Sequence, residues 1–451
     1  MDADLVILGG GPAGYSAALR AAQLGARPVL IERARVGGTC LHLGCIPAKT
    51  LLAAAELRVR AAGMEGLGLS VAAPDVAALN RRKRGVVEAL ASQLQSLLAA
   101  SCVNVVPGEG ELVEPGVVRV RRVDGGEETF RGGKVIVATG SEPRSLPGVV
   151  RVPGRVMNSN DLITADSWPD SLIIVGGGVI GAEFASLFAI LGVKVVLLEA
   201  LPRLLMGEDS DLGKRMMRAL TRNGIEVRVG EKMESLAEES VGVRVRTVSG
   251  GDFRAAAALL CVGRSPCLSG VDAGALGLES VMGAIRVDAE MRTSLQGVFA
   301  AGDVTGGPQL AHLAAAQGRK AASSALGVED LVDLSTVPRC VYSIPEAAAV
   351  GLGEERVRER NIKYRKAVVL WRGVSRAQCI NETEGMTKVI AEEGTGRILG
   401  AHIFGHCASE LISEACLAIR LNLTVKAVSD TMHPHPALSE SFAQACAQLA
   451  R

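Results

Sequence analysis

The sequence predicts an α/β fold built on parallel β-sheets, and three observations carry this prediction. Glycine accounts for 53 of the 451 residues, whereas aromatic residues make up only 3%. This composition favours many tight turns between strands and helices. One pattern occurs twice, at 4–32 and at 171–199: an apolar run, a glycine cluster, a helical pattern and a second apolar run. Each copy is typical of the βαβ unit that begins a dinucleotide-binding domain, so we expect two Rossmann-like domains.

The first copy contains a Gly-x-Gly-x-x-Gly fingerprint. Its glycines are Gly9, Gly11 and Gly14, and Glu32 follows eighteen residues later. Such glycines permit a tight turn and bring the backbone close to a pyrophosphate at a helix N-terminus, while the acidic residue binds a ribose hydroxyl. The pattern alone is weak, but the flanking strand, helix and acid argue against a mere glycine-rich turn.

The second copy repeats the fingerprint with the same spacing. Gly176, Gly178 and Gly181 are followed eighteen residues later by Glu199. A carboxylate at this strand end repels a 2′-phosphate and accepts from a free hydroxyl, which favours NAD over NADP. Arg203 lies nearby in the sequence and could weaken that preference.

The chain between and after the two copies divides into further units. Apolar and charged residues alternate over 111–131, which predicts a small antiparallel meander, and Pro143, Pro147 and Pro153 mark a domain crossing. Beyond about 334, strand-like runs surround helical segments without a third fingerprint, which predicts an α+β unit. The predicted domains are 1–147, 148–268, 269–333 and 334–451.

Charge and cysteine usage exclude several classes of protein. The net charge is +1 with a pI near 7.6, so no electrostatic footprint for nucleic acid is present. No run approaches the about 20 uninterrupted apolar residues of a membrane span, and the strand-like start leaves no room for a signal peptide. Ten scattered cysteines do not form a secreted disulfide framework. We expect a cytoplasmic protein that binds neither nucleic acid nor a membrane.

Two of those cysteines, Cys40 and Cys45, lie in the segment GGTCLHLGCIPAK at 37–49. They could be metal ligands or unrelated thiols, but no second pair with zinc spacing accompanies them, so we expect no metal. A regular helix holds residues five apart beyond the about 7 Å that a disulfide allows between Cα atoms. Gly44 and Pro47 are placed to distort a helix start, and a helix N-terminus would lower a thiol's pKa.

This segment, just after the first fingerprint, resembles the redox segment of the class I pyridine nucleotide–disulfide oxidoreductases. That family includes dihydrolipoamide dehydrogenases, glutathione reductases and mercuric reductases. The resemblance covers essentially the whole chain, since 293–304 (TSLQGVFAAGDV) is similar to the family's second FAD motif. It implies FAD and NAD as cofactors, a redox disulfide between Cys40 and Cys45, and a Lys49–Glu183 pair beside the flavin. The further cofactor contacts it implies are Gly38, Thr39, Thr139, Gly140, Gly263, Arg264, Gly302 and Asp303.

The C-terminal segment MHPHPALSE at 432–440 resembles the ending of dihydrolipoamide dehydrogenases. His435 would be a general base oriented by the carboxylate of Glu440, although a histidine between two prolines can also be a structural turn element. In the family this base serves the neighbouring subunit, so the resemblance implies a homodimer and a C-terminal dimerisation domain. It also implies oxidation of dihydrolipoamide carried on the lipoyl domain of a 2-oxoacid dehydrogenase complex or of the glycine cleavage system.

The chain departs from the family's pattern at several positions. His42 stands where Asn is frequent, Ala48 where Ser or Thr is common, and the segment Leu313–Gly318 replaces a more usual lysine and acidic pair. These departures leave open a reductase of another disulfide or of a metal ion. A mercuric reductase is disfavoured because the C-terminus has only the lone Cys446. A non-catalytic flavoprotein subunit is the alternative from another class.

Overall fold

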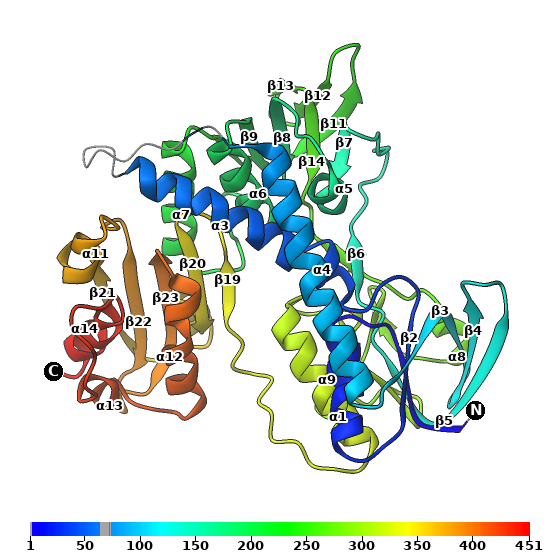
Figure 1. Ribbon diagram of the computed structural model, residues 1–451. Coiled ribbons are helices and arrows are strands. Elements are labelled where there is room, and N and C mark those ends of the chain that lie inside the picture. The colour runs from blue at the N-terminus through cyan, green and yellow to red at the C-terminus, as the bar shows by residue number, and fades with distance from the viewer. Residues whose placement is uncertain (1, 64–71, 73) are drawn as a thin grey trace. The chain divides into compact units, whose positions relative to one another are not determined.

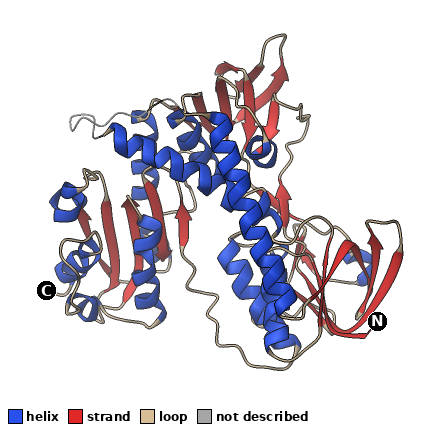
Figure 2. Cartoon of the chain, viewed as in Figure 1, coloured by secondary structure: helices blue, strands red, loops and turns tan. Residues whose placement is uncertain are grey.

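The chain is described by a computed structural model that covers residues 2–63, 72 and 74–451 (Figures 1 and 2). It divides into two compact units, each made of several chain segments. The first unit comprises 1–50, 80–144 and 264–334, and the second comprises 51–79, 145–263 and 335–451.

The first unit is built on a mixed sheet. Strand β1 (Asp2–Leu8) lies between β2 (Pro28–Glu32) and β5 (Glu127–Val137), all parallel, and β18 (Val298–Ala300) extends the sheet beside β5. Strand β3 (Asn104–Glu114) runs parallel to β2 and then joins β4 (Val117–Arg122) and β5 in an antiparallel meander. The meander predicted for 111–131 is therefore confirmed.

Both faces of β1 are buried, because its side chains alternate between two cores. Leu5 and Ile7 pack in a cluster with α1 (Pro12–Gln23) and α9 (Ala311–Ala325), whereas Val6 and Leu8 pack in a second cluster on the other face. The two helices approach closely, since a Cβ added to Gly318 would lie 2.0 Å from the carbonyl oxygen of Ala13. The strand's continuous apolar sequence is explained by this two-sided burial.

The second unit contains the predicted second parallel sheet. Its strand order is β10 (Glu226–Val229), β9 (Lys194–Glu199), β8 (Ser171–Val175), β14 (Ala257–Leu260) and β7 (Val156–Asn158). Helices α6 (Val179–Ile190) and α7 (Ser210–Arg222) accompany it. A separate antiparallel sheet is formed by β11 (Met233–Glu238), β12 (Val243–Thr247) and β13 (Asp252–Ala255).

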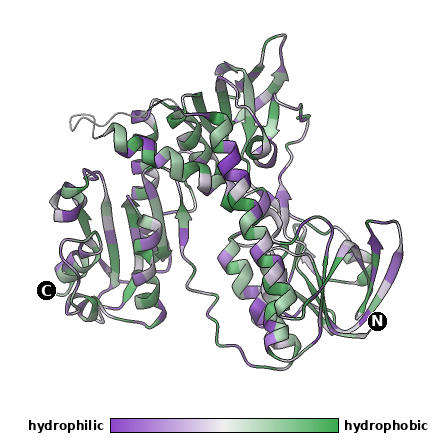
Figure 3. Cartoon of the chain, in the orientation of Figure 1, coloured by the Kyte–Doolittle hydropathy of each residue, from purple (hydrophilic) through white to green (hydrophobic). Residues whose placement is uncertain are grey.

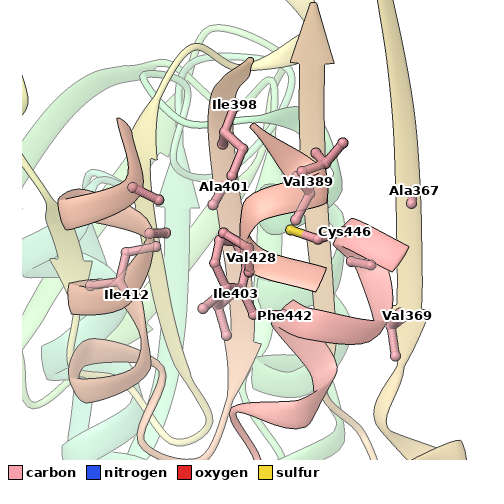
Figure 4. Close-up of a cluster of buried hydrophobic side chains, with 14 of the residues drawn as sticks. Ala367, Val369, Val389, Ile398, Ala401, Ile403, Ile412, Val428, Phe442 and Cys446 are labelled. Carbon is pink, nitrogen blue, oxygen red and sulfur yellow. The ribbon is translucent and has the colours of Figure 1, made fainter. Parts of the chain in front are cut away.

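The C-terminal part of the second unit is an α+β layer structure, as predicted. Its antiparallel sheet has the order β19 (Arg339–Val341), β20 (Glu346–Gly351), β23 (Ile398–Gly405), β22 (Met386–Glu392) and β21 (Tyr364–Leu370). Helices α12 (Ala408–Arg420) and α14 (Glu440–Leu449) contact this sheet. Figure 4 shows the core between them, in which Ile403, Phe442 and Cys446 meet.

A buried ion cluster also lies in the second unit. The ammonium group of Lys388 is fully buried and contacts Asp209 Oδ1 at 2.9 Å, Asp211 Oδ2 at 2.8 Å and Glu354 Oε2 at 2.9 Å. Asp209 also caps α7, because its Oδ1 accepts from the N–H of Asp211. The cluster ties α7 to β22 and to α10 (Glu354–Glu359).

The remaining elements are connectors and short segments. Hydrophilic and hydrophobic residues alternate around the longest helix, α4 (Val76–Ala100) (Figure 3). The others are α2 (Gly38–His42), α3 (Cys45–Ala62), β6 (Ser141–Pro143), α5 (Ser159–Thr164), β15 (Arg264–Pro266), α8 (Ala273–Leu276), β16 (Ser280–Val281), β17 (Ala284–Ile285), α11 (Ser375–Cys379), α13 (Val425–Ser429) and the 3-10 helices η2 (Asp303–Thr305) and η3 (Trp371–Gly373).

One helical stretch of the described residues, Gly38–Ala62, is long and apolar enough to cross a membrane when judged by length and composition alone. Core helices pass the same test. In the structure this stretch is broken at Leu43 and Gly44 into α2 and α3, and it carries the cysteine pair. It is therefore weak support for a membrane span.

Candidate active site

The first fingerprint forms a glycine cradle at the N-terminus of α1. A Cβ added to Gly9 would lie 2.3 Å from the oxygen of Ala138, and one added to Gly14 would lie 1.7 Å from the oxygen of Gly9. These two glycines are therefore required by close packing of the backbone. A Cβ on Gly11 would meet no atom within 4 Å. Gly11 thus faces open space beside the helix N-terminus, where a pyrophosphate fits.

The acidic residue of the first fingerprint is fixed by two backbone groups. Glu32 Oε2 accepts from the N–H of Gly10 at 2.6 Å, and Oε1 accepts from the N–H of Ala34 at 2.7 Å. The carboxylate is thereby held at the end of β2, next to the glycines. This is the position that ribose recognition requires.

The second fingerprint has the same geometry. A Cβ added to Gly176 would lie 2.3 Å from the oxygen of Cys261, and one added to Gly181 would lie 1.8 Å from the oxygen of Gly176. A Cβ added to Gly178 would meet no atom within 4 Å. Glu199 accepts from the N–H groups of Gly177 at 2.6 Å and Leu201 at 2.7 Å. The repeat seen in the sequence is therefore a repeat of atomic contacts.

Arg203 does not extend toward solvent beside Glu199. Its guanidinium donates to the carbonyl oxygens of Leu205 at 3.2 Å and Glu208 at 2.9 Å, and it forms an ion pair with Glu355 at 3.0 Å. These contacts occupy the arginine that the sequence placed near the ribose site. Its weakening of an NAD preference is thus not supported by its position.

The cysteine pair is brought together by a break between two helices. Cys40 lies in α2 and Cys45 is the first residue of α3, with Leu43 and Gly44 between the helices. The two side chains hydrogen-bond to each other. The predicted distortion at Gly44 is confirmed, and the pair is close enough for thiol–disulfide exchange.

The segment before the pair is attached to the first fingerprint. Gly37, in a left-handed conformation, donates its N–H to the oxygen of Gly10 at 2.8 Å. A Cβ on Gly38 would lie 2.8 Å from the Cα of Gly11. The redox segment, including Thr39, therefore lies directly against the cradle that would hold the FAD pyrophosphate.

The lowering of pKa expected for a thiol at a helix N-terminus is not seen at Cys40, the third residue of α2. The hydrogen bond to Cys45 raises the pKa of the Cys40 thiol, and burial and the negative charge of Cys45 raise it further, while Lys49 lowers it. When two adjacent thiols interact, the thiolate formed by losing the first proton accepts a hydrogen bond from the remaining thiol. The second proton is therefore held strongly. Burial and the two cysteines also raise the pKa of Tyr15, which places this phenol near the pair.

A chain of polar contacts fixes the aspartate of the second FAD motif. Arg264 donates from Nε to Ser141 Oγ at 2.8 Å and from Nη2 to the Ser141 carbonyl at 2.7 Å, and Ser141 Oγ donates to Asp303 Oδ2 at 2.5 Å. Burial lowers the pKa of Arg264, and Asp303 opposes that effect. Sequence reasoning included Arg264 and Asp303 but missed Ser141, although it directly follows Gly140.

Neighbouring turns complete this part of the first unit. Thr139 donates to the oxygen of Cys267 at 2.5 Å, and Gly140 and Gly302 have positive φ angles of 76° and 82°. Gln317 Oε1 accepts from the N–H of Gly302 at 2.9 Å. Gln317 thus supports the turn that presents the aspartate at position 303, a role that the sequence did not reveal.

The proposed flavin-side pair lies in two different units. Lys49 is on α3, one turn after Cys45, and its charge acts on Cys40. Glu183 on α6 is 4% exposed, and its Oε1 accepts from the N–H of Tyr342 at 2.9 Å. Gly263, which has a φ of 96° and faces open space, belongs to the second unit. The pairing of Lys49 with Glu183 stays a prediction.

The departures from the family pattern have local explanations. The Nε2 atom of His42 lies 2.9 Å from the oxygen of Val36, so the imidazole braces the redox segment. Ala48 and Leu313 are buried. Gly318 is required by the close approach of α9 to α1, as described above.

The two histidines of the C-terminal segment have different surroundings. His435 Nδ1 lies 2.9 Å from Glu440 Oε1, and 68% of the His435 side chain is exposed. His433 instead contacts Glu414 Oε1 through Nε2 at 2.8 Å and the oxygen of Thr431 through Nδ1 at 2.9 Å, and its side chain is 9% exposed. His433 is thus held by two contacts and mostly covered, whereas His435 is oriented by a carboxylate and exposed.

The residues fit two dinucleotides. The first cradle, Glu32 and the Ser141–Asp303 contact would hold FAD beside the cysteine pair, and the second cradle with Glu199 would hold NAD. Among the described residues, no group of three or more histidine, cysteine or acidic side chains could hold a metal ion.

Comparisons with known proteins agree with this arrangement. Residues 3–318 match the family model of the pyridine nucleotide-disulphide oxidoreductases, and residues 337–446 match the dimerisation domain of that family. The dihydrolipoyl dehydrogenases of Chlamydia muridarum and Bacillus subtilis are 37% and 36% identical to this chain. The matches cover 98% of this chain and 95% and 97% of those proteins.

Two solved structures share the fold. LpdA from Mycobacterium tuberculosis superimposes with a TM-score of 0.93 at 31% identity, over 99% of each chain. The Cu(II) complex of the HOCl-induced flavoprotein disulfide reductase RclA from Escherichia coli gives a TM-score of 0.89 at 29% identity, also over 99% of each chain. FAD and NAD are the cofactors of this group of enzymes. The chain belongs to the pyridine nucleotide–disulphide oxidoreductase family, and its C-terminal segment is that family's dimerisation domain.

Proposed function

We propose that this oxidoreductase oxidises dihydrolipoamide to lipoamide and reduces NAD+, as a dihydrolipoyl dehydrogenase. The contact between His435 and Glu440 carries the proposal, because it supplies an oriented base for a dithiol substrate in a chain that also holds an adjacent cysteine pair. The names of the relatives from Chlamydia muridarum and Bacillus subtilis support the same substrate.

The chain's own residues perform the exchange as follows. His435 takes a proton from one thiol of dihydrolipoamide, and the resulting thiolate attacks Cys40 of the oxidised pair, which breaks the Cys40–Cys45 bond. His435 gives that proton to the Cys40 sulfur as it leaves and takes the proton of the second substrate thiol, whose sulfur displaces Cys40 and closes the lipoamide disulfide. Cys40 is left as a thiol and Cys45 as a thiolate, so both are reduced. Glu440 keeps the imidazole in the tautomer that accepts at Nε2 and stabilises its protonated form. FAD, held by the first glycine cradle and Glu32, would supply the redox chemistry that links the dithiol to NAD+.

The proposal includes a homodimer in which His435 of each chain serves the cysteine pair of its partner. The match of residues 337–446 to a dimerisation domain supports this arrangement. The macromolecular partner would be a lipoyl domain of a 2-oxoacid dehydrogenase complex or of the glycine cleavage system, in the cytoplasm.

NAD is proposed over NADP on the geometry of the second cradle. Glu199 is held at the strand end by two backbone N–H groups, where its charge would repel a 2′-phosphate. The nearby cation, Arg203, is engaged by carbonyl oxygens and Glu355. Because this guanidinium is already bound to other groups, it would do little to offset the repulsion between Glu199 and a 2′-phosphate.

The experiment is NADH formation by the purified holoenzyme, given dihydrolipoamide and NAD+, with NADP+ in parallel. Rapid reduction of NAD+ alone is the expected result. No reduction, in a protein whose bound flavin and cysteine pair are reducible by NADH, would contradict the lipoamide substrate and point to a reductase of another disulfide. A metal-ion reductase that binds its metal through C-terminal cysteines is disfavoured, since Cys446 is fully buried in the core and burial raises its pKa to about 12.

A further inference from the structure

A cysteine, a histidine and a glutamate meet at the N-terminus of α12. The Sγ atom of Cys407 lies 3.2 Å from His406 Nε2, and His406 Nδ1 lies 2.8 Å from Glu56 Oε1. All three residues belong to the second unit, and none of them takes part in the proposed lipoamide reaction. A thiol beside an imidazole whose other nitrogen is held by a carboxylate is the arrangement of an activated nucleophile.

We infer that Cys407, His406 and Glu56 form a second reactive-thiol site, in which the Cys407 sulfur attacks small electrophiles of the peroxide class with His406 as its base.

The geometry assigns a separate task to each ring nitrogen of His406. Glu56 accepts from Nδ1–H, so Nε2 carries the lone pair that faces the thiol. Cys407 is the N-cap residue of α12, and its backbone has a left-handed conformation with φ 57° and ψ 26°. Non-glycine residues in this conformation are uncommon and often lie at functional positions. Cys407 is half-buried, which leaves it within reach of small reagents.

The charges around the site favour a neutral resting thiol. Burial and nearby carboxylates raise the pKa of the Cys407 thiol to about 11, and the hydrogen bond to Glu56 raises the pKa of His406. The other charged groups that face the pair are Arg60 on α3, Glu346 on β20, Glu382 after α11 and Glu410 in the first turn of α12. The thiol therefore depends on His406 to remove its proton, and this distinguishes the site from a spontaneously ionised cysteine.

The reaction with hydrogen peroxide balances within the site. His406 Nε2 takes the thiol proton, the sulfur attacks one peroxide oxygen, and an S–O bond forms while the O–O bond breaks. The leaving hydroxide takes the proton from the imidazolium and departs as water. The sulfur is oxidised by two electrons to a sulfenic acid and the peroxide is reduced.

The test compares the modification rates of individual cysteines in the holoenzyme. The protein is treated with hydrogen peroxide and a sulfenic-acid trap, or with iodoacetamide, and each cysteine peptide is quantified by mass spectrometry over a range of pH. Cys102 and Cys379 are exposed and serve as internal standards for ordinary thiols. We expect Cys407 to react at least tenfold faster than both at pH 7.5, although it is less exposed.

Two variants test the role of the base. His406→Gln is expected to lower the Cys407 rate at least tenfold and to move its pH profile toward the alkaline range of an isolated buried thiol, with Cys102 and Cys379 unchanged. Glu56→Gln retains the base but lowers its pKa, so the profile should shift to lower pH. Flavin absorbance and the melting temperature report whether each variant is folded.

Two results would overturn the inference. One is a Cys407 rate in the wild-type protein no higher than that of Cys102 and Cys379. The other is a wild-type profile that rises only above about pH 9, as for a thiol without a base. Both use the unaltered protein, so they decide the matter even if His406→Gln does not fold. Lipoamide turnover is measured separately and is independent of either outcome.

Discussion

The Nδ1 atom of His435 lies 2.9 Å from Oε1 of Glu440, and the other oxygen of that carboxylate accepts a 2.9 Å hydrogen bond from the N–H of Ala437. The backbone hydrogen bond and the histidine lower the pKa of Glu440, so the carboxylate stays ionised and fixed at neutral pH. An ionised, immobile partner holds the imidazole ring of His435 in one tautomer.

Replacing His435 with glutamine should lower kcat for dihydrolipoamide oxidation by about 10² to 10⁴-fold, because the substrate thiol loses its general base. The measurement is steady-state NADH formation. His433→Gln is the matched control, since it removes a structural contact with Glu414 and should lower stability more than rate. Equal losses of rate in the two variants would contradict the assignment.

Replacing Cys45 with serine should leave FAD bound but abolish dithiol turnover, because no disulfide can then form with Cys40. Flavin absorbance checks cofactor content, and dihydrolipoamide-driven reduction of NAD+ checks turnover. Cys379→Ser, at an exposed position, is the control and should behave as the wild type. Near-normal turnover in Cys45→Ser would rule out the exchange scheme.

Replacing Glu199 with alanine should reduce the preference for NAD+ over NADP+ by about tenfold or more, since the carboxylate both binds the free hydroxyl and repels a 2′-phosphate. The ratio of kcat/KM for the two dinucleotides measures this effect. Arg203→Ala should leave the ratio nearly unchanged, because its guanidinium is held by Leu205, Glu208 and Glu355. A collapse of the ratio in Arg203→Ala would show that this cation contacts the dinucleotide.

Alanine at Gly11 and at Gly14 should have opposite consequences. A Cβ at Gly14 would lie 1.7 Å from the oxygen of Gly9, so Gly14→Ala should destabilise the first unit. A Cβ at Gly11 meets no protein atom within 4 Å, so Gly11→Ala should keep the fold and weaken FAD binding instead. Melting temperature and FAD titration separate the two effects. Unchanged FAD affinity in Gly11→Ala would place the pyrophosphate elsewhere.

Replacing Lys388 with methionine should lower the free energy of unfolding by about 3–5 kcal/mol, because it leaves buried carboxylates without their cation. Denaturant unfolding at pH 7 measures the loss. Lys366→Met is the matched control, since Lys366 also contacts Glu354 but is 45% exposed and should cost less than about 1 kcal/mol. A similar loss in both variants would contradict the role of burial.

The same cluster predicts a loss of stability in acid. Burial opposes ionisation of both Asp209 and Glu354. His402, a backbone hydrogen bond and Lys388 nevertheless lower the pKa of Asp209 to about 2, and Lys366, Lys388 and Tyr364 lower that of Glu354 to about 2. Because these folded-state pKa values lie below the unfolded ones, the stabilisation is present above about pH 4.5 and is lost as the pH falls toward 2. Unfolding midpoints measured at pH 7 and pH 3 should differ in the wild type and differ less in Lys388→Met.

The parallel sheets and both glycine cradles could be predicted from the sequence because their causes are local. A continuous apolar run means two-sided burial, as at Leu5 and Ile7, and the glycines of the fingerprint are required by contacts a few residues away. The break between α2 and α3 was predicted for the same reason, since Gly44 lies inside it.

Hydrogen bonds between segments far apart in the sequence could not be predicted from local sequence patterns. Ser141 reaches Asp303 across 162 positions of sequence, and Glu56 reaches His406 across 350, and neither contact leaves a periodic signal. The rise in the Cys40 pKa was not predicted either, because it results from the hydrogen bond to Cys45 and from burial in the folded chain.

In each fingerprint the residue between the first two glycines, Gly10 or Gly177, accepts a backbone hydrogen bond at its carbonyl oxygen from the loop after the second strand. In the first copy the donor is Gly37, which opens the redox segment, and in the second it is Leu205, in a loop without reactive groups. The same backbone hydrogen bond therefore positions a loop with a cysteine pair in one copy and a loop without cysteine in the other. The thiol–disulfide exchange chemistry therefore depends on the sequence of this one loop, whereas the nucleotide-binding frame around it is common to both copies.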